Sequence, residues 1–566
     1  MKEQKTKNLW LINFALGLVG KKQYRAVKKF AKDCKKTANT TLRGIIEYAK
    51  DTEWGKAHNF GKILEAKTDE ELIELWQKNV PPADYEDFRP FIERHKHGEE
   101  NILFPGKPKM YATTSGTTNE PKWIPITNEY YNNVYSKMTN LWLYSFMMHR
   151  KDCFAGPAMS IVGKAIEGYA PDGTVYGSVS GVTRRDIPDF IKPIHSAPAD
   201  VFDIKDYTAR YYTIMRIGIE QDLHIIITAN PSTVVEMQNN VNEYFDDYIK
   251  DIENGTLNAN LNISDEVRQA LAPCFKPNPK RAQELRDLKA KYGNVLPKHY
   301  WPRLRVLTTW KCGNTKVYMD KFKNSFPEDT LYQEFSYFAS ECRAGLVLNG
   351  KDDTVLFPQF HYFEFVDEKD LENPNPSFKQ LYELEQGHRY SLFVTTYAGL
   401  YRYNMNDLVE VTGKFDTIPT IQFIQKINGI ISMTGEKLHE RQFIQAINQS
   451  EKDTNIKLRF FVGFADVKNS VYQIYYEFEN QNISDEEIQM FNKKVDENLK
   501  KINIEYNAKR DSLRIAEPVP HVLTKDSFEH FKEECLKQGF RDGQFKLNLL
   551  MQDEKRHAMF KTLERK

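Results

Sequence analysis

The chain has 566 residues, 40% of them hydrophobic, and its 79 basic and 78 acidic side chains leave a formal net charge of +1. A chain of this length can form several folding units, because domains usually have roughly 100 to 200 residues. The charge balance gives no electrostatic case for nucleic acid, which is bound by clustered basic surface, or for an anionic membrane. We therefore expect a small-molecule partner.

The N-terminal region has an apolar run at residues 9–19, preceded by three lysines. The run is shorter than the roughly 20 residues that span a bilayer, and no small-residue cleavage site follows it, so a packed or amphipathic helix is predicted rather than export or stable membrane association. The six cysteines are far apart and form no C-x-x-C pair, which is typical of reduced thiols. We expect a cytoplasmic protein.

Helices are predicted from there to about residue 80, one of them with a capping box formed by Thr68 and Glu71. The stretch from Tyr111 to Pro125 then reads Y-A-T-T-S-G-T-T-N-E-P-K-W-I-P. Within ten positions it collects hydroxyls, one glycine and one cation: Thr113, Thr114, Ser115, Gly116, Thr117, Thr118 and Lys122.

This composition suits the binding of a polyphosphate. Gly116 lets the backbone approach a ligand closely, hydroxyls and N–H groups donate hydrogen bonds, and Lys122 adds a compact positive charge. The G-x-x-x-x-G-K-[ST] pattern of the nucleotide P-loop is absent. Taken alone, such a run is more often a surface turn, but the apolar sequence on both sides and the helix that follows favour a binding loop.

The next region predicts a helix capped by Asn128, with an apolar face from Tyr131 to Phe146. Short Gly- and Ser-rich strands are expected over residues 160–194. Buried strands at 223–228 and 304–309, with helices at 232–248 and 315–326, suggest a mainly parallel sheet covered by helices. Ligands of such sheets collect at the carboxyl ends of the strands.

The last part of the chain reads as a self-contained α+β domain. Strands are predicted at 457–466 and 471–479, followed by a helix whose capping box is Ser484 and Glu487. Another strand starts at Leu513 and another helix ends before Gly539. The fold class is thus α/β, with a large N-terminal compound domain over 1–426 and a small α+β domain over 427–566.

Three stretches, in this order, resemble the adenylate-forming superfamily, which includes acyl-CoA synthetases, luciferases and the acyl acid amido synthetases of the auxin-responsive Gretchen Hagen family. The loop contains S-G-T-T-x-x-P-K. Tyr337 to Glu341 matches Y-x-[SA]-S-E, and Gly399 to Tyr403, with Asp407, matches G-L-Y-R-Y-x-x-x-D. The likeness runs from about residue 60 to the C-terminus and is greatest to the amido synthetases.

The resemblance implies roles for these residues. Tyr337 would lie against the adenine of ATP, Glu341 would hold Mg²⁺ near the phosphates, and Asp407 would bind the ribose hydroxyls. Lys546, in a G-Q-x-K segment, would be catalytic and would be brought over the nucleotide by a mobile C-terminal domain. Further expected nucleotide contacts are Thr114, Ser115, Gly116, Thr117, Thr118, Lys122, Phe338, Ala339, Ser340, Tyr401, Arg402 and Lys426.

The chain departs from the superfamily pattern at several positions. Asn119 and Asn406 stand where glycine is common, and Asn is the residue that best tolerates left-handed backbone after glycine. The hinge has Lys426-Ile427-Asn428 in place of Arg-x-Asp, and Leu547 to Leu549 stand where proline is common.

The resemblance implies that a carboxylic acid is activated by ATP as an acyl-adenylate and then transferred to an amine, which is expected to belong to an amino acid. Two alternatives stay open. An acyl-CoA ligase has the same three motifs and differs in the acceptor, and a non-catalytic nucleotide-binding scaffold is compatible with the departures. Neither the acid nor the oligomeric state can be read from the sequence, and a monomer is compatible with it.

Overall fold

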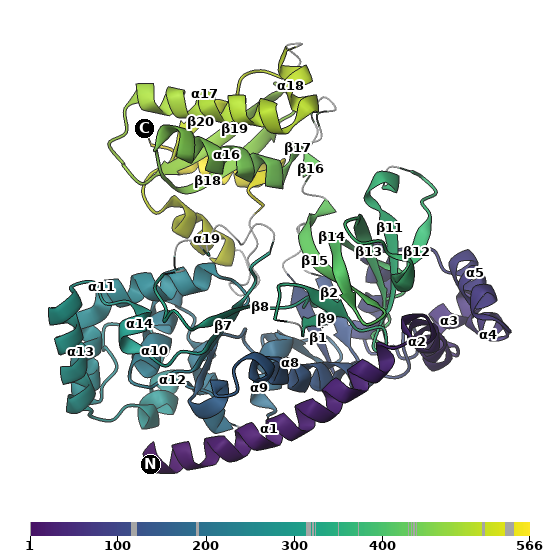
Figure 1. Ribbon diagram of the computed structural model, residues 1–566, viewed down its shortest axis with the longest axis horizontal. Coiled ribbons are helices and arrows are strands. Elements are labelled where there is room, and N and C mark those ends of the chain that lie inside the picture. Colours follow the sequence, from purple (N-terminus) through teal and green to yellow (C-terminus); the bar gives the residue numbers. More distant parts are fainter. Residues whose placement is uncertain are drawn as a thin grey trace. The chain divides into compact units, whose positions relative to one another are not determined.

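The computed structural model describes the chain except for residues 1, 115–121, 188–191, 313–318, 320–321, 323, 349, 372, 428–429, 432, 434–435, 437, 512–514, 538–547 and 566. The chain forms two compact units, Met1–Ile424 and Gln425–Lys566 (Figure 1). Among the described residues, no helix has both the length and the apolar character needed to cross a membrane.

The first unit begins with helices. Thr68 caps α5, because its hydroxyl accepts a hydrogen bond from the Glu71 N–H at 3.1 Å. The Glu71 carboxylate accepts from the Lys67 N–H at 2.7 Å, one residue before the donor expected for a capping box. These helices are α1 (Lys2–Phe30), α2 (Cys34–Ala49), α3 (Glu53–Ala57), α4 (Phe60–Leu64), α5 (Asp69–Asn79) and α6 (Tyr85–Lys96).

A parallel sheet of order β3-β6-β7-β8 forms the centre of the part that contains residues 158–334. Its strands are β3 (Ala158–Ser160), β6 (Ile225–Ile227), β7 (Val306–Thr309) and β8 (Leu331–Glu334). Apolar side chains of β6 and β7 form a common core with the surrounding helices, and these helices are seen beside β7 in Figure 1. The helices are α10 (Tyr207–Ile219), α11 (Ser232–Asn254), α12 (Asp265–Leu271), α13 (Pro279–Tyr292) and α14 (Pro297–Tyr300).

A second sheet has the order β2-β1-β5-β4 and carries the predicted binding loop between two of its strands. Thr127, not Asn128, caps the helix that follows, because the Thr127 hydroxyl accepts from the Tyr130 N–H at 3.1 Å. The elements are β1 (Met110–Thr114), β2 (Lys122–Ile126), α7 (Asn128–Tyr130), a π-helical turn η1 (Tyr131–Tyr135), α8 (Ser136–His149), β4 (Gly168–Tyr169), β5 (Val175–Gly177) and α9 (Val179–Arg185).

The third sheet has seven strands in the order β12-β11-β13-β14-β15-β10-β9. The pairs β12–β11, β11–β13, β13–β14, β15–β10 and β10–β9 are antiparallel, whereas the strands of the β3-β6-β7-β8 sheet and the β1–β5 pair are parallel. The strands are β9 (Gly345–Val347), β10 (Thr354–Leu356), β11 (Tyr362–Asp367), β12 (Phe378–Gln380), β13 (Arg389–Thr395), β14 (Tyr403–Phe415) and β15 (Ile418–Lys426). The α/β class is confirmed, and the short links explain the antiparallel sheet, since a parallel pair needs a long crossover.

The second unit is an α+β fold with a sheet of order β20-β19-β18-β21. The capping box of Ser484 and Glu487 is confirmed, whereas the strand expected from Leu513 begins at Val519. The elements are β16 (Ile430–Ile431), β17 (Leu438–His439), α16 (Glu440–Thr454), β18 (Leu458–Asp466), β19 (Val471–Phe478), α17 (Asp485–Ile502), α18 (Ile504–Asp511), β20 (Val519–Val522), α19 (Ser527–Lys537), β21 (Leu550–Met551) and α20 (Glu554–Thr562).

Candidate functional site

The predicted binding loop closes a β-hairpin. Strands β1 and β2 pair antiparallel, and their last matched positions are Thr114 and Lys122. The hairpin therefore holds the two ends of the loop side by side. Ser115, Gly116, Thr117 and Thr118 lie outside the described residues.

Lys122 lies among aromatic rings at the end of this hairpin. Its Nζ donates to the Tyr403 hydroxyl at 3.3 Å and lies 5.5 Å from the centre of the Tyr85 ring. The Tyr85 hydroxyl in turn accepts from the Trp123 N–H at 2.6 Å, which ties the neighbouring residue of β2 to helix α6. The ammonium group is thereby directed toward Tyr403, which starts β14 and belongs to the third motif.

The second and third motifs meet in a hydrogen bond from the Tyr337 hydroxyl to the Asp407 carboxylate, across 70 positions of sequence. Both side chains are buried. Burial raises the pKa of the Tyr337 phenol well above its usual value, and the negative charge of Asp407 adds to this rise. The phenol therefore stays a hydrogen-bond donor at neutral pH.

Glu341 adds a carboxylate to the same place. Burial raises the pKa of Tyr403 well above its usual value, and the charge of Glu341 is the next cause of the rise. Glu341 also contributes to the raised pKa of Tyr337, after burial and the effects of Asp407 and Cys342. The half-buried Glu341 thus lies near both tyrosines, and through Tyr403 near Lys122.

The backbone before Asp407 has the conformation anticipated for a glycine substitute. Asn406 has φ +55°, and its N–H donates to the Asn404 side-chain oxygen at 2.9 Å. The β13–β14 register shifts at this point, between Ser391 and Phe393. Such a bulge redirects side chains, and here it accompanies the turn of Asp407 toward Tyr337. Asn119 lies outside the described residues.

Two features of the residues just before the second motif gave no signal in the sequence. Ser336, just before Tyr337, has φ +82°, and its hydroxyl accepts from the Val347 N–H at 3.0 Å; residues in such conformations are often found at functional sites. Glu334 ends β8 with its carboxylate buried, and it accepts from the Lys311 N–H at 2.6 Å and the Cys312 N–H at 3.2 Å. Burial raises the pKa of Glu334 to about 7.

The middle of the second motif is a compact turn. The Ala339 N–H donates to the Cys342 carbonyl at 2.9 Å, and Ser340 is half-buried. The Phe338 ring lies 5.4 Å from that of Trp142 and under the Arg343 guanidinium at 4.6 Å. This turn holds Tyr337 and Glu341 at its two ends.

Tyr401 and Arg402 have other partners. The Tyr401 hydroxyl donates to the Leu103 carbonyl. Arg402 forms a fully buried ion pair with Glu364 at 2.9 Å and donates to the Val80 carbonyl at 2.8 Å. These contacts support the turn that leads to Asp407, and contact of either side chain with a nucleotide stays a prediction. The partner of Arg402 lies 38 positions away, so no local pattern could reveal it.

The remaining two candidates belong to the second unit. Lys426 ends β15 and is exposed. Lys546 lies outside the described residues. The structure therefore groups Lys122, Tyr337, Glu341 and Asp407 within the first unit.

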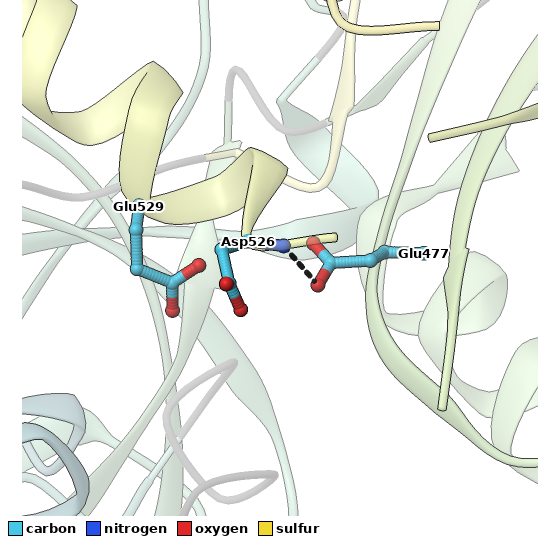
Figure 2. Close-up of side chains that lie close together, drawn as sticks. All are labelled: Glu477, Asp526 and Glu529. Carbon is cyan, nitrogen blue, oxygen red and sulfur yellow. Dashed lines mark hydrogen bonds between the residues drawn. The ribbon is translucent and has the colours of Figure 1, made fainter. Parts of the chain in front are cut away.

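A separate acidic cluster in the second unit consists of Glu477, Asp526 and Glu529, whose ligand atoms lie within 4.8 Å of one another (Figure 2). Glu477 accepts from the Asp526 N–H at 2.9 Å, which ties the start of α19 to strand β19. Arg459 pairs with Asp526 at 3.3 Å. Acidic groups are favoured at the N-terminus of a helix, so these contacts explain the cluster as an anchor for α19.

The chain is similar to known proteins in sequence. Three family models match in chain order: the GH3 family N-terminal domain at residues 23–331, the central domain at 354–426 and the C-terminal domain at 441–555. A jasmonoyl–L-amino acid synthetase of Oryza sativa subsp. japonica is 24% identical over 91% of this chain and 92% of its own. An indole-3-acetic acid-amido synthetase of Arabidopsis thaliana is 25% identical over 79% and 76%.

Solved structures show the same fold. The GH3.15 acyl acid amido synthetase in complex with 2,4-DB superposes with a TM-score of 0.81 at 18% identity, over 97% of this chain and 96% of that one. A 2-hydroxyisobutyryl-CoA ligase in complex with an acyl-AMP gives 0.52 at 11% identity, over 93% and 91%. Since the N-terminal model alone matches more than half of the 566 residues, the chain belongs to the GH3 family.

Proposed function

We propose that the protein is an ATP-dependent acyl acid amido synthetase. A carboxylate oxygen of the acid attacks the α-phosphorus of ATP, which gives an acyl-adenylate and releases pyrophosphate. The amine of an amino acid then attacks the activated carbonyl carbon, forms an amide and releases AMP. The names of the relatives support this reaction, since they are amido synthetases and a ligase that joins 4-substituted benzoates to glutamate.

The observation that carries the proposal is the hydrogen bond between Tyr337 and Asp407, beside the hairpin that carries Lys122. This bond joins the second and third motifs, and the hydrogen bond from Lys122 to Tyr403 joins the first motif to the third. Tyr337 would offer its ring to the adenine, and Asp407 would accept hydrogen bonds from ribose hydroxyls. Lys122, with residues 114–118, would bind the phosphates.

Catalysis would rest on positioning and on charge stabilisation. In this proposal Lys546 stabilises negative charge that develops at the α-phosphorus. The assignment of the ATP and acyl sites to residues 1–426, and of a mobile lid to 427–566, is part of the same proposal. A closed site would protect the acyl-adenylate from water.

The Glu341 carboxylate is a suitable ligand for a magnesium ion. Glu341 presents a half-buried carboxylate near Tyr403 and Lys122, and Mg²⁺ prefers carboxylate and phosphate oxygens. Mg²⁺ held by Glu341 would neutralise phosphate charge.

An acyl-CoA ligase is the second candidate, since such a ligase has a similar fold. The family match favours the amide product. We also propose a cytoplasmic location, which the wide spacing of the six cysteines and the absence of a C-x-x-C pair from the sequence support.

The test is to incubate the protein with ATP, Mg²⁺ and a panel of aromatic, fatty and small acids, and to add either amino acids or CoA. Mass spectrometry should find an acyl-amino acid and AMP. An acyl-CoA in its place would identify the ligase, and AMP binding without any product would point to the non-catalytic scaffold.

A further inference from the structure

Arg184, the sixth residue of helix α9, is a buried cation that the proposed reaction does not use. Its residue is 8% exposed. One of its terminal nitrogens donates to the Ala197 carbonyl, and the guanidinium lies 5.6 Å from the centre of the Phe202 ring. Within the part of the chain that the structure describes, its Nε and Nη1 are buried without a hydrogen-bond partner, and no carboxylate pairs with it.

This arrangement is unfavourable for the protein alone. A buried charge is normally paired and fully hydrogen-bonded, because removing it from water is costly. Burial is the sole cause of the drop in the pKa of Arg184 to about 10, so the side chain still carries its charge at neutral pH. Two buried N–H donors and an unbalanced positive charge match an anionic ligand.

Neutral hydrogen-bonding groups lie close to Arg184. His195 lies near Arg184, and burial, followed by the charge of Arg184, lowers the pKa of His195 to about 3. The Nδ1 atom of the neutral imidazole lies 3.4 Å from the hydroxyl oxygen of Ser160. Ser160 ends β3, at the carboxyl edge of the parallel sheet, where ligands of such sheets collect.

A second buried arginine lies beside the same part of the molecule. Arg343 follows the second motif, lies 3.4 Å from the centre of the Tyr135 ring and donates to the Thr139 hydroxyl at 2.5 Å. Tyr131 stacks on Tyr135 at 5.7 Å, and its hydroxyl lies near Thr183, the neighbour of Arg184. The turn η1 thus links Arg184 to the second motif.

We propose that Arg184 is the centre of a carboxylate-binding subsite, with Ser160 and His195 as neutral hydrogen-bonding groups. The carboxylate belongs either to the acid that is activated or to the amino acid acceptor. The choice between these sources rests on the proposed function, whereas binding to Arg184 does not require adenylation. The subsite can therefore be tested in the absence of ATP.

The experiment compares the melting temperature of the full chain with that of the Arg184→Met and Arg184→Lys variants. Arg185→Met is the matched control, because Arg185 is exposed and pairs with Asp186 at 3.0 Å. The probes are carboxylates and amides of similar shape. The acid arm uses benzoate against benzamide and terephthalate against 4-carbamoylbenzoate, and the acceptor arm uses glycine against glycinamide and glutamate against glutamine.

At least one carboxylate should stabilise the wild type and Arg185→Met more than its amide does, and the responding arm identifies the source. Arg184→Met should bind that carboxylate about ten- to a hundredfold more weakly, as expected for the loss of charged hydrogen bonds, and Arg184→Lys should retain part of the binding. Without ligand, Arg184→Met should melt no lower than wild type, because it removes an unpaired buried charge.

Three results would overturn the subsite: no carboxylate is preferred over its amide, the preference survives in Arg184→Met, or Arg184→Met melts several degrees lower without ligand. A protein that binds the carboxylate through Arg184 yet forms no acyl-adenylate would refute the proposed function and leave the subsite standing. A protein that forms an acyl-adenylate but does not bind the carboxylate through Arg184 would refute the subsite alone.

Discussion

Replacing Glu334 by Gln should make the first unit more stable at neutral and alkaline pH. The carboxyl group has a pKa of about 7 in the folded protein, against 4.5 for an unperturbed glutamate. Between these two pH values the folded state holds a proton that the unfolded state has lost, so stability falls as pH rises. The stability present below pH 4.5 is therefore lost by about pH 7.

The size of this effect follows from the difference between the two pKa values, which corresponds to about 3 kcal/mol. Glutamine cannot ionise, and its carbonyl oxygen can still accept from the Lys311 and Cys312 N–H groups, which both reach the same carboxylate oxygen in the wild type. We expect the stability of Glu334→Gln relative to wild type to rise by about 2 to 3 kcal/mol between pH 5 and pH 8.

Urea unfolding followed by tryptophan fluorescence can measure this difference. All seven tryptophans precede residue 425, so the signal reports on the first unit. Taking the difference between two pH values removes any cost of the substitution that does not depend on pH. A relative stability that stays constant within about 0.5 kcal/mol from pH 5 to pH 8, well below the change expected from linkage, would refute the assignment of a raised pKa to Glu334.

Three further substitutions test other parts of the account. Arg402→Met should destabilise the first unit by about 3 to 5 kcal/mol in urea unfolding, because it leaves Glu364 buried without its partner. The control Arg389→Met, at a half-exposed ion pair, should cost at most about 1 kcal/mol. Equal losses of stability in the two variants would contradict the structural role of Arg402. Asp407→Ala should weaken ATP binding in calorimetry by about tenfold or more, and unchanged affinity would rule out the ribose role. Lys546→Ala should slow formation of the acyl-adenylate in single-turnover assays at least about tenfold; a normal rate would show that the lysine is not catalytic.

The sequence was most informative where a local pattern determines a local structure. Apolar runs predicted the buried strands β6 and β7, and the capping box at Ser484 predicted the start of α17. Asn406 was expected to tolerate a left-handed backbone, and it has φ +55°. Asn128 was expected to cap the helix that follows β2, and this prediction was wrong, because the hydroxyl of Thr127 is the group that reaches the Tyr130 N–H.

Features that depend on distant residues could not be predicted. Arg402 belongs to a motif that predicts nucleotide contact, and its guanidinium donates a hydrogen bond to Glu364 on strand β11. The environment of Glu334 depends on the chain after β7, and its pKa responds to burial that only the folded sheet creates. The strand order of the seven-stranded sheet likewise depends on distant segments, because β15 pairs with β10, which lies far earlier in the sequence.

The most direct test of the account is exchange between ATP and labelled pyrophosphate, measured with the panel of acids and with and without magnesium. Exchange that depends on an acid and on Mg²⁺, and that Asp407→Ala weakens, is the predicted result, because only reversible formation of an acyl-adenylate returns label to ATP. No exchange with any acid, while AMP still binds, would contradict the central claim that this protein activates a carboxylic acid.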